Sequence, residues 1–251
     1  MSKSKELIVY WSPGLNTYDG EVIDRSFLYP KPESIFLDKS RQKSKLSVPN
    51  ASFFACPAVN KKMQNTIVFS NSVNSSYHFD FTDIENKVVE SVPNSLDISV
   101  LRNPILDSGP CLSIGLSYML FAEESVNAFF TPPYFHEAKY TKYGAVIPGE
   151  FDIGQWFRPY HIDLQMWSNK GNLVIEDGEP LFYVEFKTDK KIKLKQFNMN
   201  KTLSSLSNSC IEATLIFGPG QTLKSRYNRF RQVGMRDKIL TEIKKNLVEE
   251  N

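Results

Sequence analysis

The chain has 251 residues, of which 41% are hydrophobic and 13% aromatic, so it is long enough to form one large domain or two small ones with a sizeable core. This composition excludes an intrinsically disordered chain, because disorder requires few apolar and few aromatic residues. The formal net charge of +2 excludes a chain that is basic throughout and binds polyanions over its whole surface.

The charge is nevertheless unevenly distributed along the chain. Residues 187–251 contain 14 basic and 6 acidic residues and carry a charge of +8, whereas the rest of the chain carries −6. This asymmetry is typical of a basic segment that meets an acidic partner, but it also fits two ordinary surfaces on a nearly neutral protein.

The cysteines and the apolar runs indicate where the protein resides. Cys56, Cys111 and Cys210 are far apart and form no C-x-x-C motif, so we expect free thiols in a reducing compartment. No segment approaches 18 consecutive apolar residues, and the apolar run at residues 7–11 is too short for a signal peptide. We therefore expect a soluble intracellular protein without a membrane partner.

The first half of the chain contains short β-type segments separated by turn signals. We predict strands at residues 7–11, 66–70, 77–81 and 87–90, the last two forming a hairpin. A polar, lysine-rich segment at residues 38–49 is predicted to be a loop. Residues 113–121 are apolar almost throughout, which predicts one buried strand that pairs with residues 129–131.

The following segments have the same character. We predict strands at residues 144–147, 155–157, 162–167, 172–176 and 181–186, separated by turns such as Pro148-Gly149 and Asp177-Gly178. Short strands at this spacing predict a mainly β fold for residues 1–195, either an antiparallel sandwich or a double-stranded β-helix of the jelly-roll type.

The pattern changes after residue 195. Residues 199–210 show no strand alternation, and Gly218-Pro219-Gly220 is a firm break. Leu223, Tyr227 and Phe230 then share one helical face, with Thr222 or Gln221 in the N-cap region. Met235, Ile239, Ile243 and Leu247 recur every four residues, which predicts a terminal helix of about four turns. We therefore expect residues 196–251 to be a helical C-terminal part that packs on the β-rich body as one structural unit.

One candidate site is a metal centre. His161 and Asp163 form an H-x-D triplet on a predicted strand, so the two side chains share a face, as in non-haem iron sites. No histidine follows position 161, so the third ligand would be His136 or Glu137, in the reverse chain order. The alternative is that these histidines serve local hydrogen bonds.

A second candidate is a ligand-binding surface in the region rich in aromatic residues and prolines. Trp156, Arg158, Tyr160 and Trp167 would provide an apolar wall with one charged anchor, the first three on one face of a predicted strand. The alternative is that these rings belong to the core of the sandwich.

A third candidate is a nucleic-acid interface on the basic helix. Its basic residues are Lys224, Arg226, Arg229 and Arg231. They surround Tyr227 and Phe230, and basic residues mixed with aromatic rings can hold phosphates and stack bases. The alternative is a solvated basic face above two core rings. The sequence contains no G-x-S-x-G motif and no phosphate-binding loop, so it assigns no catalytic residue and no cofactor.

Several segments resemble a family of uncharacterised proteins of marine tailed bacteriophages, which includes proteins of T4-like cyanophages. The similar segments are residues 10–13 (YWSP), 131–135 (TPPYF), 142–149 (KYGAVIPG), 156–158 (WFR), 178–182 (GEPLF), 226–230 (RYNRF) and 242–247 (EIKKNL). The resemblance covers most of the chain. It implies a viral gene product in the cytoplasm of an infected bacterium, with association with the virion left open, and it implies no catalytic residue.

These observations lead to three functional hypotheses. The first is a phage-encoded, non-enzymatic binding protein that acts on a host or viral component. The second is an enzyme that depends on a metal or a small molecule and is built on a cupin-like scaffold, with His161, Asp163 and His136 as ligands. The third is a nucleic-acid-binding protein that uses the basic helix. The oligomeric state is not indicated by the sequence.

Overall fold

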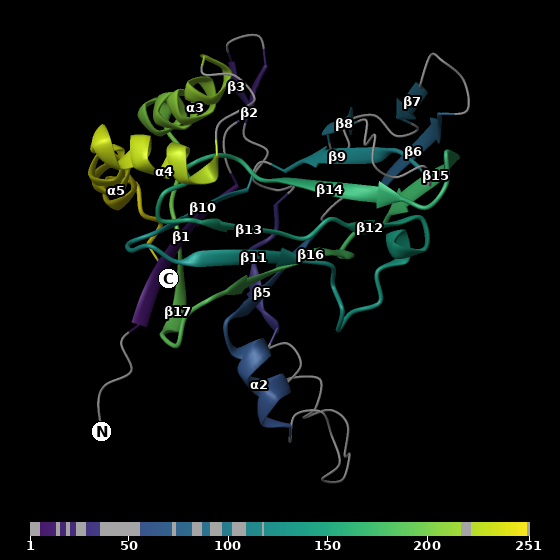
Figure 1. Ribbon diagram of the computed structural model, residues 1–251, viewed down its shortest axis with the longest axis horizontal. Helices are drawn as coiled ribbons and strands as arrows, with labels where there is room; N and C mark the ends of the chain where they lie inside the picture. Colours follow the sequence, from purple (N-terminus) through teal and green to yellow (C-terminus); the bar gives the residue numbers. More distant parts are fainter. Residues whose placement is uncertain are drawn as a thin grey trace.

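The computed structural model describes residues 6–13, 16–18, 21–23, 29–35, 56–71, 74–81, 87–90, 97–101, 109–116, 118–216 and 222–249. Within these residues the fold is mainly β, with several antiparallel sheets followed by C-terminal helices, as predicted (Figure 1). The predicted loop at residues 38–49 and the break at Gly218-Pro219-Gly220 lie outside the described residues.

Two sheets face each other and form a sandwich-like body (Figure 1). One has the order β12 (Gly144–Val146), β14 (His161–Met166), β9 (Cys111–Gly115) and β8 (Asp97–Leu101). The other has the order β13 (Gly149–Asp152), β11 (Asn127–Thr131), β16 (Pro180–Phe186), β5 (Thr66–Ser70) and β4 (Glu33–Ser34). Ile114 and Leu164 of the first sheet belong to the same buried cluster as Phe130 and Phe182 of the second, and we call this cluster the main core.

A third sheet separates the main core from the C-terminal helices. Its order is β10 (Met119–Ala122), β1 (Glu6–Ser12) and β17 (Lys191–Gln196), with β1 antiparallel to β10 and parallel to β17. Side chains along a strand alternate between its two faces. Val9 and Trp11 therefore point into the main core, whereas Tyr10 between them points toward the helices. Strand β10 and residues 9–12 of β1 are therefore buried on both faces, whereas the edge strand β17 is partly exposed.

Further elements complete the body. A sheet of β15 (Lys170–Ile175), β6 (Ser75–Asp80) and β7 (Lys87–Glu90) lies at the end opposite the C-terminal helices (Figure 1). The remaining elements are the hairpin β2 (Asn16–Tyr18) and β3 (Glu21–Ile23), the helix α2 (Pro57–Gln64) and the 3-10 helix η3 (Lys139–Lys142). The predicted hairpin is confirmed, because β6 pairs with β7 in antiparallel register.

The helices α3 (Lys201–Ile216), α4 (Leu223–Gln232) and α5 (Met235–Lys245) cover the outer face of the third sheet. Thr222 caps α4, since its hydroxyl accepts a hydrogen bond from the Ser225 amide at 3.2 Å. Gly234 has a φ of 59°, a left-handed conformation that favours glycine and lets the chain turn sharply from α4 into α5. The helices close a second core, formed by Tyr10, Met119, Phe121, Phe157, Phe197, Leu203, Phe230, Ile239 and Ile243.

Some predicted strands were wrong. The apolar residues 113–121 form two strands, β9 and β10, which belong to different sheets. The chain leaves the first strand at Leu116, whose amide donates to Tyr160 O at 2.9 Å. Residues 129–131 pair with β13 and β16 and not with residues 113–121. An apolar run thus predicts burial, but it does not reveal where the chain changes sheets.

The terminal helix is also shorter than predicted. It ends at Lys245, and Asn246 closes it by donating from its side chain to the Glu242 carbonyl oxygen at 2.8 Å. Leu247 lies in extended chain, in a β-bridge with Phe197. The four-residue repeat continued past the end of the helix because Leu247 still packs against the second core.

All three cysteines are free thiols, as expected. Within the described part of the chain, no helix is both long enough and apolar enough to cross a lipid bilayer.

Candidate functional site

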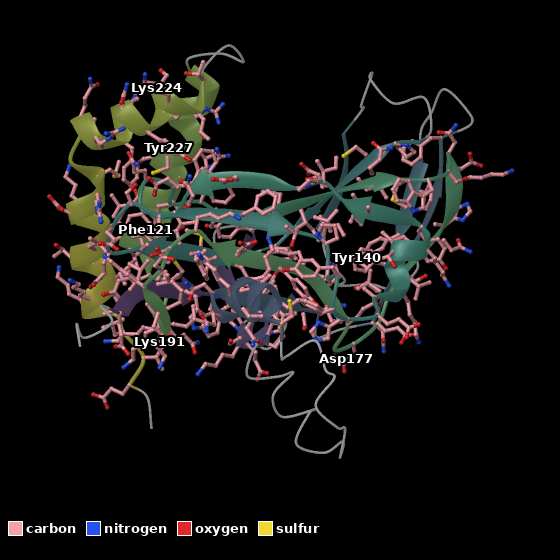
Figure 2. All side chains as sticks on the ribbon, turned by 60° about the horizontal axis from the view of Figure 1, so that its bottom comes forward. Phe121, Tyr140, Asp177, Lys191, Lys224 and Tyr227 are labelled. Carbon is pink, nitrogen blue, oxygen red and sulfur yellow. The ribbon has the colours of Figure 1, made fainter. Side chains whose placement is uncertain are left out.

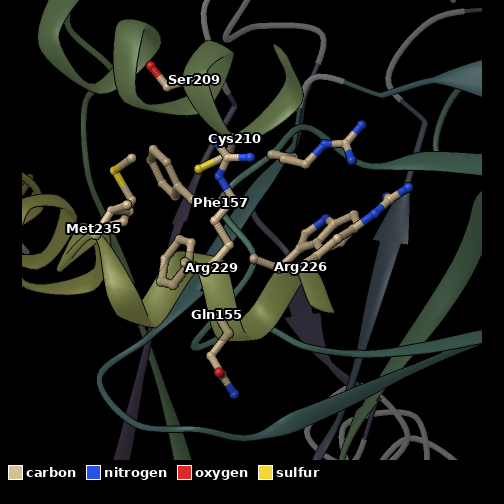
Figure 3. Close-up of a pocket in the computed structure, with 11 residues that line it drawn as sticks. Gln155, Phe157, Ser209, Cys210, Arg226, Arg229 and Met235 are labelled. Atoms are coloured by element: carbon tan, nitrogen blue, oxygen red, sulfur yellow. The ribbon is translucent and has the colours of Figure 1, made fainter. Parts of the chain in front are cut away.

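A pocket of about 220 Å³ lies where the segment between β13 and β14 meets the C-terminal helices (Figure 3). Its apolar lining comes from Trp156, Phe157, Phe230, Val233 and Met235. The segment before β14 thus supplies one wall, and α4 together with the start of α5 supplies another. Ser209 and Cys210 of α3 complete the lining.

The apolar side of the pocket is part of the second core. Phe157 is fully buried and packs edge-to-face on Phe121, with ring centroids 5.4 Å apart. Phe121 also contacts Phe230, with centroids 6.2 Å apart. This chain of rings fixes the pocket wall on the sheet below it, because edge-to-face aromatic pairs have a preferred geometry.

Three arginines line the same pocket: Arg158, Arg226 and Arg229. Among the described residues that line it, none is acidic. The Arg158 guanidinium lies over the Trp156 ring, 4.8 Å from its centroid, in a cation–π contact. Burial, and then the positive charge of Arg226, lower the pKa of the Arg158 guanidinium. The described lining of the pocket therefore combines apolar side chains with positively charged ones.

Arg226 contributes a donor that the fold does not use. Its Nε atom is buried and has no hydrogen-bond partner within the described residues. A buried N–H group without a partner is costly, so such groups are nearly always paired with protein, water or ligand. The same residue lines the pocket, so the unused donor lies beside the space that a ligand would occupy.

The pocket wall before β14 begins at a tight turn that Asp152 organises. The buried Asp152 carboxylate accepts hydrogen bonds from Ser125 Oγ, the Val126 and Gly154 amides and Gln155 Nε2. A Cβ atom at position 154 would lie 2.3 Å from the Glu124 carbonyl oxygen, so only glycine fits there. This network fixes where the wall leaves β13.

Tyr227 joins α4 to the same turn. Its hydroxyl accepts a hydrogen bond from the Asp152 backbone amide at 2.6 Å. Burial raises the pKa of Tyr227, so the phenol stays neutral near pH 7. Figure 2 shows Tyr227 between α4 and the strands. The hydrogen bond between Tyr227 and Asp152 thus fixes the distance between α4, which carries Arg226, and the segment before β14, which carries Arg158.

Cys210 adds a thiol to the pocket without adding negative charge. Burial raises the pKa of this thiol to about 11, although the charge of Arg158 acts in the opposite direction. A thiol with this pKa is protonated near neutral pH and is a poor nucleophile. Cys210 therefore contributes no negative charge to the pocket near neutral pH.

The predicted ligand-binding residues divide into two groups. Trp156 and Arg158 line the pocket, whereas Tyr160 is buried in the main core and Trp167 is exposed at the end of β14, where it donates to Thr141 O. The predicted strand at residues 155–157 was wrong, since this segment is a turn and loop between β13 and β14. The alternation used to place three residues on one face therefore does not apply.

The four residues that were predicted to bind nucleic acid also fall into two groups. Arg226 and Arg229, three positions apart, line the pocket. Lys224 and Arg231, seven positions apart, share the other face of α4. Figure 2 shows Lys224 on the outer side of this helix, and Arg231 bonds to Asn228 within it. The structure therefore does not bring the four residues together on one surface.

The predicted metal ligands are not assembled into a site. His161 is exposed and Asp163 half-buried on β14, whereas the Nδ1 atom of His136 bonds to the hydroxyl of Tyr183 in the opposite sheet. Among the described residues, no group of three or more His, Cys, Asp or Glu side chains is placed to hold a metal ion. His136 serves a local hydrogen bond, the alternative considered for these histidines.

Sequence reasoning missed that one site uses both the loop and the helix. Phe157, Cys210 and Met235 line the pocket with the arginines, but each looked like an ordinary core residue. The available signal was that arginine recurs beside aromatic residues in residues 156–158 and again in residues 226–230. Nothing in the sequence joins these segments, which are about seventy positions apart.

Comparisons with known proteins do not add to this picture. No protein-family model matches the chain, and no curated protein matches it.

Proposed function

We propose that this protein acts by binding an anionic ligand with a small apolar part in the pocket between α4 and the segment before β14. The observation that carries the proposal is that the Arg158 and Arg226 guanidinium groups approach one apolar cavity, with no acidic side chain among its described lining residues. If the resemblance to phage proteins reflects kinship, the ligand belongs to a host or viral component.

The two guanidinium groups lie in a pocket from which water is partly excluded. Two guanidinium groups repel each other, and the repulsion is stronger where water is excluded than at an open surface. An anion between them would remove this repulsion and accept hydrogen bonds from both groups. Hydrogen bonds to charged groups contribute about 1.5–3 kcal/mol each, enough to select a ligand by its charge.

The apolar side of the pocket explains why a simple ion is not the best ligand. Phe157, Phe230 and Met235 present no charge to the cavity, and Phe157 is held rigidly by Phe121. Ligand sites typically combine such an apolar wall with a few polar groups that fix orientation. A molecule with one apolar group and one anionic group satisfies both sides.

The proposal is tested by calorimetric titration with benzenesulfonate and with benzyl alcohol, its uncharged counterpart. We expect the sulfonate to bind and the alcohol to bind much more weakly. Arg158→Met and Arg226→Met should each weaken sulfonate binding by at least about tenfold, because each removes one charged donor. The matched control is Lys224→Met, which removes the same charge from the outer face of α4 and should leave binding unchanged.

Two results would contradict the proposal. One is the absence of binding by any anionic aromatic compound to a folded protein. The other is equal weakening by Lys224→Met and Arg226→Met, which would mean that the helix attracts anions through its overall charge. A steep dependence of DNA binding on salt, lost in Lys224→Met and Arg231→Met, would favour the nucleic-acid hypothesis instead.

A further inference from the structure

The arginine pocket supports a narrower statement about its ligand, which rests on the proposed function. We infer that the anionic group is the phosphate of a monoester, carried on a compact apolar group about the size of one aromatic ring. Three properties of the pocket support this inference: the charge of its arginines, the number of their N–H donors and the volume of the cavity.

The charge of the pocket matches a dianion better than a monoanion. Arg158 and Arg226 line the same pocket and are close enough for the positive charge of Arg226, after burial, to lower the pKa of Arg158. Cys210 stays protonated near neutral pH and contributes no negative charge. A phosphate monoester carries about −1.5 to −2 at pH 7, whereas a carboxylate or sulfonate carries −1. Only the phosphate balances both guanidinium groups.

The donors in the pocket match the acceptors of a phosphate. Each guanidinium offers five N–H donors in a planar fork and accepts no hydrogen bond. The buried Nε of Arg226 is one such donor that lacks a partner within the described residues. A phosphate monoester has three strong terminal acceptor oxygens and can take paired hydrogen bonds from two arginines at once. A carboxylate has only two acceptor oxygens, which lie in one plane, and carries half the charge of a phosphate dianion.

The size of the cavity limits what else the ligand carries. A volume of about 220 Å³ lies below the range of roughly 300–1,000 Å³ that is typical of pockets for larger ligands. The space equals that of about seven water molecules at roughly 30 Å³ each. A phosphate and one ring fill this space, and any larger part of the ligand would extend past the half-exposed Val233 into solvent.

The inference is tested with phenyl phosphate and benzenesulfonate, which share the ring and differ in the charge of the anionic group. At pH 7.5 we expect phenyl phosphate to bind at least about tenfold more tightly, because its second negative charge strengthens the hydrogen bonds from the two guanidinium groups. Its affinity should fall when the pH is lowered through about 6, where the phosphate loses its second charge, while sulfonate binding stays constant. Arg226→Met should abolish the difference between the two ligands, and Lys224→Met should preserve it.

The outcomes separate this inference from the proposed function. Equal binding of both compounds with no dependence on pH would overturn the phosphate assignment and leave anion binding intact. Absence of binding by either compound would overturn both. Inorganic phosphate that binds as tightly as phenyl phosphate would overturn the assignment of an apolar group. A mononucleotide and a phosphotyrosine peptide then serve as arms that distinguish a metabolite from a protein as the source of the phosphate.

Discussion

The main core and the second core are built from similar residues, but different elements enclose them. In the main core, Phe182 stacks on Phe69 with ring centroids 4.7 Å apart, and strands from two sheets enclose the rings completely. In the second core, rings such as Phe157 and Phe230 are enclosed on one side by a sheet and on the other by helices, and a pocket remains between them. The first arrangement fills its space, whereas the second leaves room for a ligand.

The difference follows from what surrounds each core. Tyr118 and Tyr140 of the main core donate their hydroxyl groups to backbone carbonyl oxygens, Tyr118 to Pro30 O at 2.7 Å and Tyr140 to Leu181 O. Burial strongly raises the pKa of Tyr118, so its ring remains neutral. At the edge of the second core, the pocket is lined by arginines and not by tyrosines bonded in this way. A closed apolar core contributes stability, whereas the second core is edged by a pocket whose lining carries positive charge.

The largest expected effect is on the free energy of unfolding when one aromatic ring in each core is truncated to alanine. Phe182→Ala should lower the free energy of unfolding by about 3–5 kcal/mol, because it leaves a closed cavity among fully buried residues. Phe230→Ala should cost less, since Phe230 already borders an open pocket. Urea unfolding of both variants measures the difference. Equal losses would mean that the pocket is packed as tightly as the main core.

A smaller effect concerns the turn that positions the pocket wall. Asp152→Ala removes a buried carboxylate that accepts hydrogen bonds from four groups, and we expect a loss of about 3 kcal/mol in unfolding free energy. Binding of benzenesulfonate should weaken as well, because Arg158 lies six residues further along this segment. The control is Glu150→Ala, an exposed carboxylate on the same strand, which should change stability by less than about 0.5 kcal/mol. Similar losses for both variants would show that the turn network has no special role.

The smallest effect concerns the attachment of α5 to the sheet. Glu123 accepts a hydrogen bond from Tyr10 at 2.6 Å and pairs with Lys244 at 3.3 Å. Burial by itself would raise the pKa of Glu123, but the contacts with Tyr10 and Lys244 outweigh burial and lower the pKa. The carboxylate therefore stabilises the fold above the ordinary glutamate pKa of about 4.3, and this contribution is lost as the pH falls below that value.

Glu123→Gln tests this expectation through the pH dependence of unfolding. The difference in unfolding free energy between the natural protein and the variant should be constant near neutral pH and should shrink in acid. Lys244→Met should reduce the same pH-dependent difference, because it removes one of the two contacts that lower the pKa. A difference that does not change with pH would mean that Glu123 holds α5 by packing alone.

Local patterns predicted much of the fold. Residues 66–70 alternate little but are apolar and bounded by turn signals, and they form β5 with the expected limits. Residues 181–186 fall within β16, and the leucine and isoleucine repeat after Gly234 predicted α5. These features depend on neighbours in the sequence, which a single chain displays directly.

The pocket depended on contacts that no local pattern displays. Trp156 and Arg158 were placed on a strand by alternation, yet they lie in a loop whose course is set by Asp152 and by packing of Phe157 on Phe121. Arg226 looked like part of a solvated basic face, and only the docking of α4 through Tyr227 turns it toward Arg158. Sites formed between distant segments require the tertiary fold before they can be recognised.

A crystal structure with bound phenyl phosphate tests the central claim most directly. We expect the phosphate oxygens within hydrogen-bonding distance of the guanidinium groups of Arg158 and Arg226, including the buried Nε of Arg226, and the phenyl ring against Phe157. A phosphate bound on the outer face of α4 beside Lys224, with the pocket empty, would contradict the account.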